Sequence, residues 1–175
     1  RAAAMEDCND SIRAKQDYYG YPHAARGRIF AIYGLYDWAV EELNIAIALG
    51  GSKRLAGKNN PKVIAYGTKA RIFATSVDPG YRNSDLAVRF AEQAVGLESN
   101  LETPAYKILN RDTLAAAYAE AGRLDEAVAE QKKTIATAIE NGWGGLTYSG
   151  ETLLDILNRH LGEFERKKPL RDGIF

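Results

Sequence analysis

Small residues recur two helical turns apart in four segments of the chain. In each segment the second small residue lies seven positions after the first and is followed by a β-branched residue. Seven residues make almost two turns of an α-helix, so the two small residues lie on one face of that helix. Such a face lets another helix approach closely, which predicts an all-α fold of packed helices. The four pairs are Ala4 and Ser11, Ala39 and Ala46, Ala87 and Ala94, and Ala127 and Thr134.

Each of the last three segments is preceded by a second apolar stretch of helical character. Two of the resulting helix pairs are separated by a Gly-x-apolar-Asp turn, with Gly34 and Asp37 in one and Gly122 and Asp125 in the other. We expect the glycine to take the left-handed conformation that ends one helix, and the aspartate side chain to cap the next helix. The preceding stretches are residues 23–33, 63–75 and 108–120.

The run Leu-Ala-Ala-Ala-Tyr-Ala-Glu-Ala-Gly-Arg-Leu-Asp-Glu-Ala within residues 112–133 resembles a tetratricopeptide repeat (TPR). A second copy has small, aromatic, glycine and alanine positions at that family's spacing, and a third copy carries an insertion at residues 77–84. The resemblance covers residues 1 to about 141 and implies a right-handed α-α superhelix, a TPR solenoid of the bacterial type. The second copy is carried by Gly27, Phe30, Gly34, Tyr36, Ala39 and Ala46, and the third by Ala70, Phe73, Ala87 and Ala94.

We therefore expect residues 1–175 to form a single solenoid of about three helix pairs, with a partial repeat before them and a capping helix after them. Asn60 and Thr103 precede prolines and are expected to cap helices. The chain begins with Arg1 rather than Met, and half a repeat stands first, which suggests a fragment of a longer protein. The expected parts are 1–18 (second helix of a preceding repeat), 21–50, 61–97 and 104–141 (repeats), 148–167 (capping helix) and 168–175 (exposed tail).

Composition argues against several classes of function. Lys+Arg and Asp+Glu are both 23, so the formal net charge is zero and no global field attracts nucleic acid or acidic membranes. The single cysteine, Cys8, allows no internal disulfide and no cysteine-based metal site, and we expect it to be a buried apolar residue. No apolar run approaches the roughly 20 residues that span a bilayer. We expect a soluble protein without membrane insertion, in the bacterial cytoplasm or periplasm.

No catalytic pattern is present either. The Gly-rich residues 50–60 lack the frame of a phosphate-binding loop, and no nucleophile motif occurs. Neither His23 nor His160 belongs to a metal-like array of His, Cys or carboxylate residues at three- or four-residue spacing, so packing is expected for them rather than metal binding. We therefore expect no enzymatic activity, no catalytic residue, no metal and no cofactor.

The resemblance also implies a binding face, because in TPR proteins the first helices of successive pairs line a concave groove. Small residues beside isolated charges would admit an extended segment or a helix of a partner. Arg28 and Arg71 could pair with a partner's carboxylates, or they could be solvated charges without a partner. The predicted groove residues are Ala24, Arg28 and Ile32, then Gly67, Arg71 and Thr75, then Asp112, Ala116 and Glu120.

The leading functional hypothesis is a non-catalytic scaffold that binds a partner protein or peptide in this groove. The alternative is a structural or assembly subunit that forms oligomers or joins a larger complex through its open amino-terminal end, residues 1–21. An enzyme or nucleotide-binding domain is the third possibility, and no motif supports it. The hypotheses on function depend on the family resemblance, since a fold does not fix a function.

Overall fold

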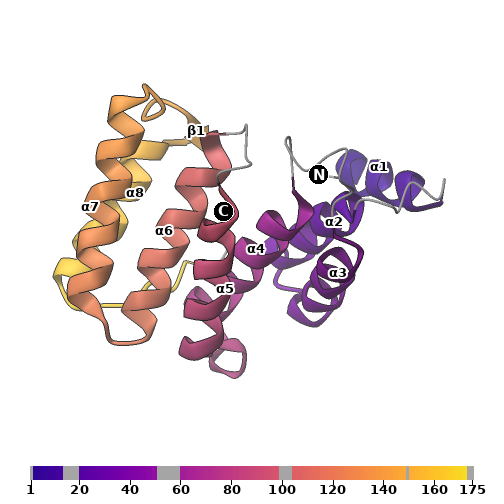
Figure 1. Ribbon diagram of the computed structural model, residues 1–175, viewed down its shortest axis with the longest axis horizontal. Helices are drawn as coiled ribbons and strands as arrows, with labels where there is room; N and C mark the ends of the chain where they lie inside the picture. The colour runs from indigo at the N-terminus through magenta and orange to yellow at the C-terminus, as the bar shows by residue number, and fades with distance from the viewer. Residues whose placement is uncertain (1, 14–19, 51–59, 99–103, 149, 173–175) are drawn as a thin grey trace.

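The computed structural model describes residues 2–13, 20–50, 60–98, 104–148 and 150–172, and in these ranges the chain is helical apart from one short β-hairpin (Figure 1). The all-α fold class is therefore confirmed. The helices are α1 (Ala2–Arg13), α2 (Tyr21–Ile32), α3 (Tyr36–Leu49), α4 (Pro61–Thr75), α5 (Ser84–Gly96), α6 (Pro104–Glu120), α7 (Leu124–Glu140) and α8 (Leu153–Glu165). The short elements are the 3-10 turn η2 (Pro79–Tyr81) and the strands β1 (Thr147–Tyr148) and β2 (Glu151–Thr152).

Three helical hairpins follow one another along the molecule: α2 with α3, α4 with α5, and α6 with α7. Gly34 and Gly122 form the first and third turns with φ of 73° and 74°, a region that residues with a side chain rarely adopt. The second turn is longer and contains η2, after which Asn83 caps α5 by accepting a hydrogen bond from the Leu86 amide. Helix α4 packs against both helices of the first hairpin, and α6 against both helices of the second.

The small residues that recur two turns apart are buried where the hairpins cross. Those of α3, α5 and α7 have no exposed surface, which lets neighbouring helices approach closely. Larger side chains fill the remaining space, among them Leu43 in the first hairpin and Leu114 in the third. Truncating a fully buried leucine such as Leu43 to alanine typically costs about 2–5 kcal/mol, so this packing accounts for much of the stability of the fold.

The predicted helix caps are only partly correct. Asn60 caps α4, because its side chain accepts a hydrogen bond from the Lys62 amide at 3.0 Å. The prediction that Asp37 and Asp125 cap their helices is wrong. Residues Leu35 and Arg123 hold the capping positions without a side-chain hydrogen bond, and both aspartates lie in the first helical turn. There a negative charge still interacts favourably with the positive end of the helix dipole.

The two ends of the described chain differ in how they pack. Helix α1 contacts α2, and Cys8 on α1 is buried as expected. The capping helix expected at 148–167 is too long at both ends, because β1 and β2 pair before it and the Thr152 side chain caps α8 by accepting from the Asp155 amide. The predicted cap at Thr103, the glycine-rich loop and residues 14–18 lie outside the described residues.

The exposed tail expected at 168–175 is wrong at Leu170, although Lys168, Arg171 and Asp172 of the C-terminal segment, residues 167–172, are exposed. Leu170 is 3% exposed and belongs to the same apolar cluster as Ala74 of α4 and Ala116 of α6. Residues 173–175 lie outside the described chain. The chain therefore turns back after α8 and packs on the first helices of two hairpins. Within the described ranges, no helix combines the length and apolar character that crossing a membrane requires.

Candidate functional site

Six of the nine residues predicted to line an open groove are buried inside the domain. Arg71 is 4% exposed and Asp112 is 0% exposed, so neither side chain lies on an open surface in this structure, and the reading of Arg71 as a solvated charge is wrong. Arg28, Ile32 and Glu120 are only half-buried. A role of these helices in partner binding stays a prediction. The six buried residues are Ala24, Gly67, Arg71, Thr75, Asp112 and Ala116.

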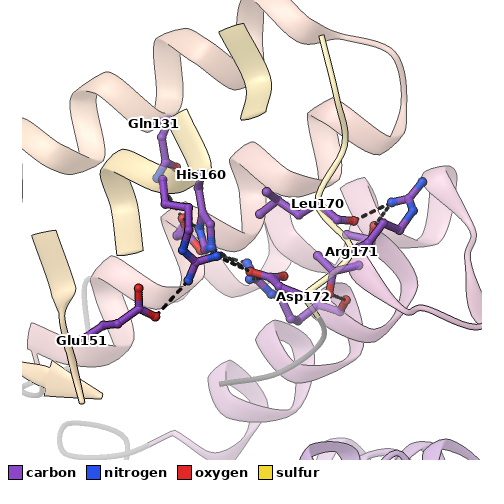
Figure 2. A network of polar contacts seen from close by, with 11 residues as sticks. Gln131, Glu151, His160, Leu170, Arg171 and Asp172 are labelled. Carbon is purple, nitrogen blue, oxygen red and sulfur yellow. Dashed lines mark hydrogen bonds and ion pairs between the residues drawn. The ribbon is translucent and has the colours of Figure 1, made fainter. Parts of the chain in front are cut away.

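The C-terminal segment covers Arg71, one of these six buried residues. Leu170, Arg171 and Asp172 lie against the network in Figure 2. Arg171 Nη1 is 2.8 Å from the Glu120 carboxylate of α6, and it donates a long hydrogen bond of 3.4 Å to the Ala74 carbonyl of α4. The segment therefore bridges α4 and α6 over the part of the predicted groove that holds Arg71, Asp112 and Glu120.

Beneath the segment lies a network of five polar side chains, which we call the polar network: Arg71, Asp112, Gln131, His160 and Asp172. One oxygen of Asp112 accepts from Arg71 Nη1 at 2.8 Å. The other lies 2.7 Å from His160 Nδ1 and accepts from Gln131 Nε2 at 2.9 Å. Asp172 approaches from the opposite side, 2.8 Å from Arg71 Nη2 and 2.7 Å from His160 Nε2. The network joins α4, α6, α7, α8 and the C-terminal segment.

The geometry favours a charged histidine. Both ring nitrogens of His160 lie 2.7 Å from a carboxylate oxygen, and the imidazolium carries an N–H on each nitrogen whereas the neutral imidazole carries only one. Burial alone would lower the pKa of His160, but the charge of Asp112 and the hydrogen bonds to Asp112 and Asp172 outweigh it and raise that pKa. With His160 protonated, two cations face two carboxylates.

The two aspartates show the opposite effect. Burial would raise the pKa of Asp112, but the charge and hydrogen bond of His160, together with the Arg71 guanidinium, lower it to about 2. The pKa of Asp172 is also lowered, because Arg71 and His160 outweigh the effect of its burial. These shifts favour the ionised form of each group, and in that form the charges of the network balance. The side chains of His160 and Asp112 have no exposed surface that a reactant could touch, so the arrangement orients helices and the C-terminal segment.

A small open pocket adjoins the covered part of this face. Asn110 is 5% exposed, and its Nδ2 makes no hydrogen bond within the described residues. The Arg28 guanidinium carbon lies 5.6 Å from the centre of the Tyr106 ring, within the range of a cation–π contact. The volume of about 40 Å³ holds roughly three waters, which suits one small polar group. The lining residues are Arg28 of α2, Ile64, Gly67, Thr68 and Arg71 of α4, and Tyr106, Leu109, Asn110 and Thr113 of α6.

Gly67 explains how the Asn110 amide fits. A Cβ at position 67 would come within 2.2 Å of Asn110 Oδ1, far below any ordinary contact distance. The glycine therefore lets the amide oxygen lie directly against α4, in a residue that also lines the pocket. A buried donor without an acceptor costs about 1–3 kcal/mol, so an acceptor that reached Nδ2 would be favoured.

The pocket shares residues with the predicted groove on α2 and α4 but not on α6. Arg28, Gly67 and Arg71 belong to both. On α6 the expected face, which begins at Asp112, points into the core, and the pocket is lined by the face that includes Thr113. Neighbouring residues differ by about 100° around a helix, so the expected register was rotated by one position. The helical glycine at position 67 was the signal that could have revealed the close approach of Asn110.

A second buried histidine has a partner that the sequence did not reveal. His23 Nδ1 of α2 lies 2.8 Å from Glu42 Oε2 of α3. Arg26 donates to the other oxygen of Glu42 at 2.6 Å and to Asn9 of α1 at 2.9 Å. These contacts tie α1 to the first hairpin. In the part of the chain that the structure describes, no group of three or more His, Cys, Asp or Glu residues is arranged to hold a metal ion.

A wider depression lies between α5, α6 and α7. It is bordered by Glu98, Lys107, Arg111, Lys133 and Trp143, among others. Burial raises the pKa of Glu98 to about 7, although Arg111 Nε, 3.1 Å from its carboxylate, acts in the opposite direction. Glu98 is therefore partly protonated near neutral pH, and its charge depends on pH in the physiological range.

Comparison with protein-family models, with curated proteins and with solved structures found no match. A function for this chain is therefore inferred from the geometry of its own residues.

Proposed function

We propose that this chain is a TPR-like superhelix that binds an extended segment of a partner protein, without catalysis, on the face formed by α2, α4 and α6. The order of the hairpins and the small residues at their crossings support this reading, together with the sequence resemblance. The observation that carries it is the pocket at Asn110, where a buried amide donor without a partner lies near the guanidinium of Arg28.

The chemistry of the pocket suits groups that an extended peptide offers. Main-chain carbonyls and side-chain carboxylates are acceptors, and Asn110 Nδ2 and the Arg28 guanidinium are donors. The Tyr106 ring beside Arg28 adds apolar surface with a polar tip, which is common at protein interfaces. A hydrogen bond between a charged and a polar group contributes about 1.5–3 kcal/mol, so each of the two donors affects affinity by roughly ten-fold or more.

Selection of displayed random peptides on the immobilised chain tests this proposal. We expect the selected peptides to bind Arg28→Ala and Asn110→Ala variants at least ten-fold more weakly than the wild type. Arg89→Ala, which changes an exposed cation on α5, is the matched control and should bind as the wild type does. The proposal would be contradicted if the selected peptides bound the Arg28→Ala and Asn110→Ala variants as tightly as the wild type, or if the selection yielded no binder.

Assembly into oligomers is the second candidate function, and one observation favours it. Tyr33, Leu35 and Trp38 at the turn between α2 and α3 are 56%, 48% and 64% exposed. An exposed apolar cluster can serve as a contact between proteins. Sedimentation of the wild type and of Trp38→Ala checks this: association that the substitution weakens supports it, and a monomer at every concentration speaks against it.

A further inference from the structure

The C-terminal segment is attached in the manner of a bound peptide. The amides of Lys167 and Lys168 still bond to the last turn of α8. Beyond them, residues 169–172 form no backbone–backbone hydrogen bond within the described chain. Their attachment consists of the buried Leu170 side chain, the contacts of Arg171 with α4 and α6, and the carboxylate of Asp172. Side-chain anchors on an extended chain are how peptides bind to helical grooves.

The site under Asp172 is organised by residues outside the segment. Asp112 fixes the inner edges of Arg71 and His160, at 2.8 Å and 2.7 Å, and Gln131 holds Asp112 in turn. The outer edges of the same two cations, Arg71 Nη2 and His160 Nε2, are thereby directed at one carboxylate position, which Asp172 fills. The helices themselves therefore place both side chains within ion-pair distance of one carboxylate position.

The covered site and the open pocket share one residue. Arg71 belongs to both, since it binds Asp172 and also lines the pocket beside Gly67 and Asn110. The two sites are therefore neighbours on α4. The Leu170 position lies on the other side, in a cluster with Ala74 and Ala116.

We propose that residues 170–172 occupy in cis a binding site for a partner segment in which an apolar residue is followed by a basic residue and then by an aspartate or glutamate. The inference rests on the proposed function, and it names the chemistry of the partner and the way binding is regulated. The apolar residue takes the place of Leu170, and the carboxylate takes the place of Asp172 between Arg71 and His160. A partner binds by displacing the chain's own segment, so the cis contact lowers its apparent affinity.

A labelled peptide of residues 165–172 with an amidated end tests this, because its only carboxylate near the anchor is the Asp172 side chain. Binding is measured by fluorescence anisotropy to the full chain. A Leu170→Ala and Asp172→Asn double variant, in which the cis segment is weakened, should bind the peptide at least ten-fold more tightly than the wild type. A peptide carrying Asp172→Asn should lose at least ten-fold in affinity. The Lys168→Ala chain, altered at an exposed position of the segment, is the control and should match the wild type.

Far-UV circular dichroism shows whether the double variant is folded. If it is not, the single Asp172→Asn chain replaces it, with the same expected order of affinities. The inference would be overturned if the wild type and a folded variant bound the peptide equally, or if neither bound it. Unfolding of both variants would also overturn it, because the segment would then be an integral part of the core. Displayed peptides that depend on Arg28 and Asn110 would still support the proposed function in those cases, so the two failures are distinguishable.

Discussion

Asp112 is the centre of the polar network, and replacing it by asparagine removes one charge at almost constant volume. The substitution leaves Arg71 and His160, 4% and 0% exposed, with Asp172 as their remaining counter-ion in the network. Removing one partner of a buried ion pair costs about 3–5 kcal/mol. The Asp172 side chain is 24% exposed and stays in place, so we expect the lower end, about 3 kcal/mol. For a chain of this length that corresponds to a fall in melting temperature of roughly 6–12 °C.

Urea denaturation followed by far-UV circular dichroism at pH 7 measures this change. Glu92→Gln removes an exposed carboxylate within α5 and is the control, expected to stay within about 0.5 kcal/mol of the wild type. A double-mutant cycle with His160→Gln should show coupling, because the two residues of the cycle, Asp112 and His160, are in direct contact. A cost below about 1 kcal/mol for Asp112→Asn would refute the idea that this network holds the helices together.

Three further predictions concern the same groups and their surroundings. The pKa of His160 is raised in the folded state. The stabilising effect of the charged imidazole is therefore complete below the unfolded pKa of about 6.5 and is lost as pH rises through the folded pKa. In urea denaturation, the difference in unfolding free energy between wild type and His160→Gln should shrink towards pH 9. Gly67→Ala places a methyl group against Asn110, so we expect at least ten-fold weaker peptide binding by anisotropy, with stability within about 1 kcal/mol because alanine favours the helix. Glu98 has a folded pKa of about 7, above the unfolded value near 4.3, so wild-type stability falls across this range, and urea titrations should show Glu98→Gln gaining relative to the wild type between pH 5 and pH 8. A free-energy difference between variant and wild type that stays constant across pH would contradict the prediction for His160 or for Glu98. Unchanged peptide affinity of the Gly67→Ala variant would contradict the prediction for Gly67.

The helical fold could be predicted because its determinants are local. The recurrence of small residues depends only on the period of the helix, and the turns at Gly34 and Gly122 depend only on backbone conformation. The cap at Asn60 is likewise set by two neighbouring residues. The misplaced cap at Asp37 shows the limit of this reasoning, because its carboxylate accepts instead from the Tyr81 hydroxyl, 44 positions away.

The candidate site could not be predicted in the same way, because its contacts join distant parts of the chain. Asp112 meets Arg71 across 41 positions and His160 across 48, and Arg71 meets Asp172 across 101. No period in the sequence encodes these pairings. The polar character of residues 167–172 suggested an exposed tail, yet a single apolar side chain, Leu170, together with charges of complementary sign, is enough to bring the segment back onto α4 and α6.

The side-chain amide of Asn110 offers the most direct measurement. Its two N–H signals, assigned from their loss in Asn110→Ala, are followed in proton–nitrogen correlation spectra while a selected peptide is added. If a partner segment binds on the face of α2, α4 and α6, both signals move in step with saturation, because Nδ2 gains the acceptor it lacks among the described residues. The exposed Asn141 amide at the end of α7 should not move. Saturated binding that leaves the Asn110 signals in place would contradict the proposed binding site.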